Sequence, residues 1–240
     1  MNDDALTLRP LRRDDYPAIA GMLRRMWYND PHMSLACARR LAMIDLHHSL
    51  DCSNDAVVAQ QGGAVVGIIA TRIDRRGIDG RGSRPESPAG ESYALRDVRK
   101  PCPHIRHVRH VHRSRWHRRH VIELAMPLLL TAEGRHGLRE MLSLVRVDAR
   151  LLQGLRPRFD AEVTLLLVDE TVRGCGVGRA LFDHAMRRFH DAGVDWYFLF
   201  TDTSCNVGFY EHRGLARLRE RRLTLRGDAT ETFYLYEGRA

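Results

Sequence analysis

Apolar residues recur along the chain at two spacings, and each spacing predicts a kind of secondary structure. Alternation at residues 6–9 predicts a first strand. Two apolar runs, 56–59 and 64–71, flank Gln60-Gln61-Gly62-Gly63, which is a β-hairpin pattern. Apolar positions three and four residues apart predict helices in four further stretches: Tyr16 to Met26, Ser34 to Leu50, Val121 to Leu130 and Leu138 to Leu152.

The second half of the chain alternates strands with helices. Residues 163–168, Val-Thr-Leu-Leu-Leu-Val, are apolar on both faces, so we expect a central strand. A glycine-rich loop and a helix over 180–190 follow, and Gly193 ends the helix. The remaining predicted elements are a strand at 196–200, a helix at 207–213 and closing strands at 222–225 and 231–236.

Positive charge is concentrated in one segment. Residues 72–120 hold 14 Lys+Arg and 5 Asp+Glu, or +9, so the rest of the chain carries −1 of the net +8. The favoured interpretation is a surface insertion, and a nucleic-acid-binding arm is not expected. Six histidines lie between His104 and His120, but their spacing fits no metal template, so we expect no metal. An alternative is that this insertion walls an acceptor site, with Trp27, Tyr28 and Trp116 contributing aromatic surface.

Composition narrows the class of protein. No apolar run reaches the roughly 20 residues of a membrane-spanning helix. The N-terminus begins Met1-Asn2-Asp3-Asp4, which does not resemble a signal peptide. The five cysteines are scattered and odd in number, which favours reduced thiols. We therefore expect a cytoplasmic protein with no membrane partner.

The glycine loop carries the clearest chemical signal. After the strand ending at Val168, the chain runs Arg173-Gly174-Cys175-Gly176-Val177-Gly178-Arg179 into a helix. Free backbone N–H groups and the helix dipole favour an anion there, and glycines let a phosphate approach the backbone. A nucleotide-hydrolysing loop needs Gly-Lys-Ser/Thr, and a dinucleotide fold needs Gly-x-Gly-x-x-Gly with more sheet to follow. A tight turn without a ligand is the remaining alternative.

Two motifs in this sequence resemble the GNAT superfamily of acetyltransferases. Arg173, Gly176 and Gly178 match the acetyl-CoA signature Arg/Gln-x-x-Gly-x-Gly/Ala. Asn206-Val-Gly-Phe209-Tyr210-Glu211-His-Arg-Gly214 is similar to the Asn…Phe-Tyr-Glu-x-x-Gly-Phe segment, with Leu215 in place of the last aromatic residue. The resemblance is strong over 160–237 and weak over 5–71.

The resemblance implies an α/β (α+β layered) GNAT fold. It would have a mixed central sheet of about six or seven strands flanked by helices. We expect one domain over residues 1–240, with residues 72–150 as an inserted loop-plus-helices segment between the third and fourth strands.

The resemblance also implies roles for individual residues. Tyr210 would be the general acid for the thiolate, and Glu162 matches a position where some members keep a catalytic base. The alternatives are core packing for Tyr210 and a solvated strand end for Glu162. The implied acetyl-CoA site comprises Leu167, Val168, Arg173, Gly174, Cys175, Gly176, Val177, Gly178, Arg179, Asn206 and Phe209.

The resulting hypothesis is transfer of an acetyl group from acetyl-CoA to a primary amine, on a small molecule or a peptide. A homodimer is left open. The alternative function is a CoA-binding regulatory or nucleic-acid-binding protein on the same scaffold, using the basic 72–120 segment.

Overall fold

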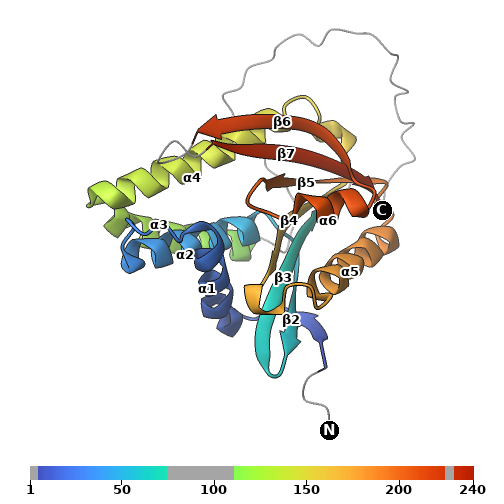
Figure 1. Ribbon diagram of the computed structural model, residues 1–240, viewed down its shortest axis with the longest axis horizontal. Coiled ribbons are helices and arrows are strands. Elements are labelled where there is room, and N and C mark those ends of the chain that lie inside the picture. Colours follow the sequence, from blue (N-terminus) through green and yellow to red (C-terminus); the bar gives the residue numbers. More distant parts are fainter. Residues whose placement is uncertain (1–4, 75–110, 225–229) are drawn as a thin grey trace.

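The computed structural model describes residues 5–74, 111–224 and 230–240 (Figure 1). The observed strands are β1 (Thr7–Pro10), β2 (Asp55–Gln61), β3 (Ala64–Ile73), β4 (Ala161–Val168), β5 (Trp196–Asp202), β6 (Ala216–Thr224) and β7 (Thr230–Arg239). The observed α-helices are α1 (Tyr16–Trp27), α2 (Leu35–Asp51), α3 (Val111–Leu129), α4 (Ala132–Leu151), α5 (Val177–Asp191) and α6 (Val207–His212).

All seven strands form one mixed sheet, as the sequence predicts. The order is β1-β2-β3-β4-β5-β7-β6, and only the β4–β5 pair is parallel. Strand β4 is central, in agreement with its apolar sequence. Helices α3 and α4 follow β3 and precede β4, so the insertion lies between the third and fourth strands. The prediction of a single domain is not tested by this topology.

Helices cover both faces of the sheet (Figure 1). One core joins α5 and α6 to the sheet, with Leu181 and Phe189 fully buried. On the opposite face, α1 and α2 pack against β2, β3 and β4 around Ile68 and Leu46. Helix α4 packs farther along this face against β5, β6 and β7. Helices on either face of the sheet can therefore supply side chains to a site at the sheet.

Local signals account for where the helices begin. Pro17 lies in the first turn of α1, where its missing N–H costs no hydrogen bond. The Ser34 hydroxyl accepts a hydrogen bond from the Cys37 N–H at 3.3 Å, which caps α2. Helix α5 begins at Val177, three residues before the prediction, because the glycine loop itself enters the helix. No described helix is both long enough and apolar enough to span a membrane.

The structure corrects the interpretation of the basic segment as surface throughout. Residues from Val111 onward are helical, and His117 is only 1% exposed. Its ring packs against Trp116 and Tyr16, and its Nδ1 lies 2.8 Å from Nδ1 of His47 on α2. Sequence periodicity missed this contact because histidine was counted as polar. Part of the segment therefore anchors α3 in the fold. Residues 75–110 lie outside the described part of the chain.

Because of this histidine contact, we expect the free energy of unfolding to decrease in acid. Burial, with His117 and His120 nearby, lowers the pKa of His47 to about 4 from 6.5. A depressed histidine pKa gives stability that is complete above about pH 6.5 and is lost as pH falls toward 4. We expect up to about 3 kcal/mol to be lost across that window. The free energy of unfolding, measured in urea between pH 4 and 7, should depend less on pH for His47→Gln than for the exposed-site control His136→Gln. The same pH dependence in both variants would contradict this account.

Candidate active site

The centre of the candidate site is a gap between β4 and β5. Their parallel pairing includes only Ala161, Val163 and one residue between them, and it ends there. The register of β3 against β4 skips Thr164, so β4 contains a bulge at the point where the strands separate. The Thr164 hydroxyl donates to the Ala70 carbonyl at 2.9 Å and stabilises the bulge. Beyond Val163, no described strand pairs with the edge of β4 that faces β5.

The predicted loop places backbone N–H groups at the open end of β4. No acceptor among the described residues receives the N–H groups of Gly174, Gly176 and residues 177–179. The side chain of Arg173 is about half exposed beside them and pairs with Glu170 at 3.7 Å. Cys175 is exposed in the same loop. These donors at the positive end of α5 fit a pyrophosphate.

Two glycines hold this loop in conformations that other residues avoid. Gly174 has φ of 83° and Gly176, the N-cap of α5, has φ of 82°. Left-handed backbone at both positions lets successive N–H groups face one side. Gly178 follows in the helix with Val168 Cγ2 3.5 Å from an ideal Cβ position. Val177 is buried against the core and fixes the helix start. The glycine spacing in the sequence therefore has a direct structural reason.

A cavity of about 560 Å³ lies between the start of α5 and α6. Its wall includes Arg179 and Asp183 from α5 and Arg213 after α6. The Arg213 guanidinium pairs with Asp183 and lies 5.4 Å from the Phe209 ring centre. Asn206 and Phe209, two of the predicted residues, also line this cavity. It provides cations and an aromatic face next to the loop, which suits a nucleotide.

Tyr210 lies in the core near the end of β5 and is 8% exposed. Its ring contacts Phe182 of α5 and Tyr236 of β7. Burial raises the pKa of Tyr210, and Cys205 and Asp202 add to the effect. The phenol therefore keeps its proton at neutral pH. A thiolate produced in the same low-dielectric environment is also a stronger base than in water, so proton transfer between the two groups remains feasible.

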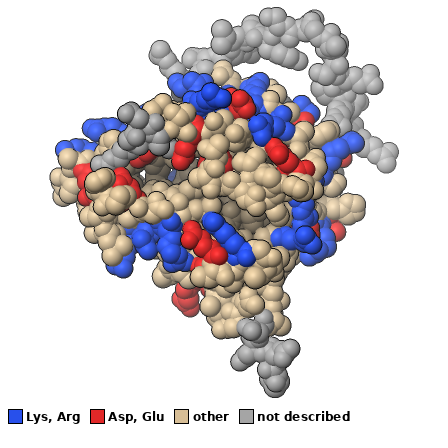
Figure 2. Space-filling model, in the orientation of Figure 1, with Lys and Arg blue, Asp and Glu red and all other residues tan. Residues whose placement is uncertain are grey.

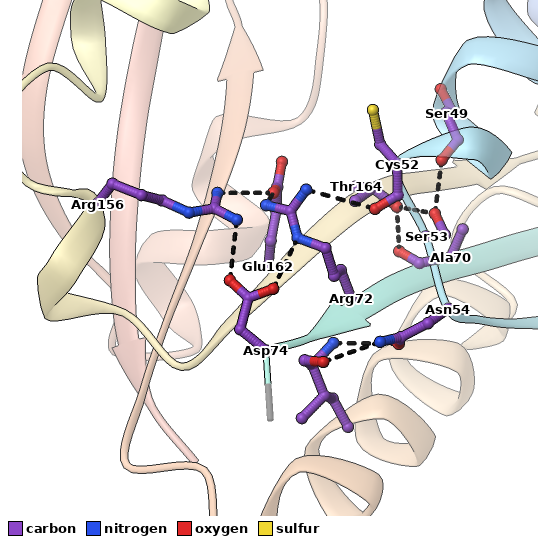
Figure 3. Close-up of polar contacts among 11 residues, drawn as sticks. Ser49, Cys52, Ser53, Asn54, Ala70, Arg72, Asp74, Arg156, Glu162 and Thr164 are labelled. Atoms are coloured by element: carbon purple, nitrogen blue, oxygen red, sulfur yellow. Dashed lines mark hydrogen bonds and ion pairs between the residues drawn. The ribbon is translucent and has the colours of Figure 1, made fainter. Parts of the chain in front are cut away.

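Glu162 lies at the start of β4, within a cluster of opposite charges (Figure 3). Arg72 of β3 binds it directly, and Arg156 approaches its carboxylate at 3.3 Å. The same two arginines hold Asp74, at 3.3 and 2.9 Å. Burial raises the pKa of Glu162, while both arginines oppose the rise. The sequence indicated the glutamate but not its partners: Arg72 is 90 residues away, and Arg156, six residues before it, reaches it only through the turn that precedes β4.

The Arg72–Glu162 pair predicts a large stability effect. Arg72→Met leaves the Glu162 carboxylate buried with Arg156 as its remaining partner. We expect a loss of about 2–3 kcal/mol, since breaking a buried pair leaves an uncompensated charge. The double variant Arg72→Met/Glu162→Gln should recover at least half of this loss. Urea unfolding at pH 7.5 measures both, and a single-variant loss no larger than the double-variant loss would contradict the buried pair.

The described residues contain no cluster of histidine, cysteine, aspartate and glutamate side chains that could hold a metal ion. Cys102 and the histidines before residue 111 lie outside the part of the chain that the structure describes. Trp116 packs against His120, with ring centres 4.1 Å apart, while Trp27 and Tyr28 belong to the core beneath α1 and α2. Trp116 packs against the same core, and all three side chains are partly buried, so the aromatic acceptor wall stays a prediction.

Comparison with known proteins finds a family that is similar to this chain around the candidate site. A family model described as "Acetyltransferase (GNAT) family" matches residues 140–215, which run from α4 through the glycine loop to α6. No curated protein matches the sequence. Over this stretch, about a third of its length, the chain is similar to the acetyltransferases of the GNAT family.

Solved structures support the fold assignment. The ribosomal-protein-S18-alanine N-acetyltransferase from Escherichia coli is similar, with a TM-score of 0.51 and 13% identity, over 98% of this chain and 94% of that chain. A variant of agmatine N-acetyltransferase is similar with a TM-score of 0.51 and 13% identity, over 99% of this chain and 100% of that chain. At these identities the similarity establishes the architecture, and the acceptor has to be argued from this chain's own residues.

Proposed function

We propose that this protein transfers the acetyl group of acetyl-CoA to a primary amine by direct attack of the amine on the thioester. The observation that carries the proposal is the juxtaposition of the free N–H groups of Gly174 and residues 176–179 with the β4–β5 gap. The free N–H groups fit a pyrophosphate. The β4–β5 gap leaves room and backbone donors for an extended chain that ends in a thioester. No metal is needed for this chemistry, since a thioester is already activated.

The cofactor-binding residues are proposed on the same geometry. Gly174, Gly176, Val177 and Gly178 present free N–H groups to the pyrophosphate, Cys175 lies between them in the loop, and Arg173 and Arg179 add charge. Asn206 and Phe209 line the adjoining cavity, where a pantetheine or adenosine portion fits. A β4 amide near Leu167 or Val168 would stabilise the tetrahedral oxyanion.

Two side chains are proposed for proton transfer. Tyr210 donates its proton to the departing thiolate, because it lies at the end of β5 and stays protonated. Glu162 is the carboxylate that the sequence offers as a base, located where β4 and β5 are still paired. Burial raises the pKa of Glu162 and so strengthens it as a base, and its two arginine partners offset part of this effect. The attacking amine must still lose a proton, so the identity of the base is a separate question.

The remaining proposals concern the acceptor, the cellular location, the oligomeric state and the domain organisation. The acceptor is an amine on a small molecule or a peptide, and cytoplasmic location with a homodimeric state stays a prediction from the sequence. The single-domain interpretation likewise stays a prediction. The basic segment gives no specific support to nucleic-acid binding, because most of it lies outside the described residues.

A thiol-release assay tests the proposed function. Purified protein is incubated with acetyl-CoA and a panel of amines: monoamines, diamines, aromatic amines and peptides with free N-termini. We expect at least one amine to accelerate CoA release at least 10-fold over buffer. If acetyl-CoA binds but no amine accelerates release, the regulatory scaffold becomes the better explanation.

A further inference from the structure

The exposed apolar side chains of the described chain gather at one place in the fold. Seven large hydrophobic residues are exposed, and six of them belong to the hairpin that α3 and α4 form. The most exposed is Leu130, at 82%, in the turn between the two helices. The six are Ile122, Met126, Leu129, Leu130, Leu142 and Val145. An apolar surface of roughly 500 Å² is as large as the largest patches on soluble monomers, and such patches are often binding surfaces.

On α3, the exposed apolar residues form one stripe. Ile122, Met126 and Leu129 are four and three residues apart, a spacing that places side chains on the same side of a helix. Leu124 and Leu128 instead pack in a core with residues of α2 and α4. The stripe therefore faces away from this core, and Leu130 extends it beyond the end of the helix.

On α4, an apolar stripe and a basic stripe run side by side. Leu142 and Val145 lie eight and eleven residues after Gly134, on the same side of the helix. Gly134 touches α3, because an ideal Cβ there would be 2.3 Å from the Leu128 carbonyl oxygen. The apolar stripe of α4 therefore borders α3. The neighbouring side of α4 carries four exposed arginines, which are Arg135, Arg139, Arg146 and Arg150.

The seventh exposed residue, Leu35, adjoins the same surface. It begins α2, next to Ser34, whose hydroxyl lies 3.1 Å from the Glu133 carboxylate in the first turn of α4. The Ser34 N–H donates to the same carboxylate. Figure 1 shows the connected ends of α3 and α4 at the edge of the molecule, away from the sheet. The apolar surface therefore lies at the periphery of the fold.

The charge of the hairpin restricts the partner. Over residues 116–151, the exposed charged side chains are six arginines and one glutamate, Glu123, which pairs with Arg119 at 2.9 Å. The acidic residues of α4 are only partly exposed and lie on a side of the helix apart from both stripes; they are Glu133, Glu140 and Asp148. A second copy of the chain would bring the arginines of two hairpins together. An anionic bilayer surface instead offers acyl chains directly beneath phosphate groups, which match the apolar and the basic stripe.

We propose that the α3–α4 hairpin binds the surface of an anionic lipid bilayer. The apolar stripes and the Leu129–Leu130 turn enter the boundary between headgroups and acyl chains, and the arginines of α4 contact the phosphates. Binding of this kind needs no spanning helix, and no described helix could span a membrane. The proposal replaces the sequence-based expectation of no membrane partner, and it does not depend on the proposed acetyl transfer.

The first test measures sedimentation of the purified protein with vesicles. One set is phosphatidylcholine alone, and the other contains about 30% phosphatidylglycerol. We expect the anionic vesicles to bind at least 10-fold more tightly, and the difference to shrink in 0.5 M NaCl because salt screens the arginines. Equal binding to both sets, or no binding to either, would overturn the proposal.

The apolar contribution needs its own variant, since net charge alone could attach a protein of charge +8 to anionic vesicles. Arginine side chains are indeed spread over the face drawn in Figure 2. Leu129→Ser/Leu130→Ser keeps the charge and changes two exposed side chains, so the fold should be retained, as checked by the unfolding temperature. We expect its affinity for the anionic vesicles to fall at least 10-fold. Unchanged affinity would mean attraction by net charge only and would overturn the proposal.

The basic stripe is tested by two variants that remove the same charge. Arg139→Gln/Arg146→Gln changes exposed residues on either side of Leu142, and Arg221→Gln/Arg222→Gln changes exposed residues of β6. We expect the first to weaken anionic vesicle binding at least 5-fold and the second to stay within twofold of wild type. Equal losses would overturn the hairpin as the binding surface.

A protein occupant of the same surface predicts other results. If a second copy covers the hairpin, light scattering should show a dimer that Leu129→Ser/Leu130→Ser dissociates, and vesicles should not bind the wild-type protein. If an acidic protein surface is the partner, the wild-type protein should be monomeric and should not bind vesicles. Either result would overturn the lipid proposal, and neither bears on acetyl transfer, which the thiol-release assay measures without lipid.

Discussion

Gly176→Ala should weaken acetyl-CoA binding by about 10-fold. Gly176 is the N-cap of α5 with φ of 82°, and an alanine held in that conformation costs about 1–2 kcal/mol. No heavy atom lies within 4 Å of an ideal Cβ at this position, so the effect comes from backbone strain and not from a clash. Relaxing that strain turns the neighbouring N–H groups away from the pyrophosphate, and 1.4 kcal/mol of lost binding equals a factor of ten.

The same helix supplies the control. Gly193 follows the C-terminus of α5 with φ of 68°, and an added Cβ there also has no neighbour within 4 Å. Gly193→Ala should lower stability by a similar amount but leave the Kd of acetyl-CoA unchanged. Calorimetric titration with acetyl-CoA, paired with urea unfolding, measures both variants. If the two variants bind acetyl-CoA equally well, the loop does not hold the pyrophosphate.

Tyr210→Phe should reduce kcat by roughly 100-fold or more, since a positioned acid contributes about 10²–10⁴ in rate. The packing of the ring against Phe182 and Tyr236 is retained, so acetyl-CoA should bind as before. The phenol at this position is buried and protonated, which leaves proton donation as its distinctive property. Thiol release under saturating acetyl-CoA is the measurement.

Tyr197→Phe is the matched control for this effect. Tyr197 of β5 is 2% exposed and packs against Phe182 and Phe189 in the same core. Removal of its hydroxyl takes away a buried phenol without touching the proposed acid. We expect its kcat to remain within about twofold of wild type. A rate loss shared by both variants would assign the effect of Tyr210→Phe to packing.

The parts of the fold that the sequence predicted are those governed by local rules. Glycines at 174 and 176 and Pro17 in a first turn each carry their own geometric reason. Strand β4 was predicted as central because its apolar residues cover both faces. The exact point of separation from β5 was not predictable, since the bulge at Thr164 depends on β3.

Helix α4 illustrates what local patterns leave out. Asp148 is one polar position in an amphipathic helix, and nothing in the sequence of α4 separates it from Glu140 or Arg146. Its pKa is raised by burial and by carboxylates of β4, β5 and α2. Burial of His117 has the same origin, as the contact is made by a residue 70 positions away. Contacts between residues that are far apart in the sequence can be identified only from the three-dimensional structure.

The most direct test of the central claim is mass analysis of the reaction between acetyl-CoA and the best amine of the panel. The account predicts one acetyl group on the amine nitrogen for each CoA released, with formation lost in Tyr210→Phe and slowed at subsaturating acetyl-CoA in Gly176→Ala. CoA release without acetylated amine, or acetylated amine formed equally by wild type and Tyr210→Phe, would contradict it.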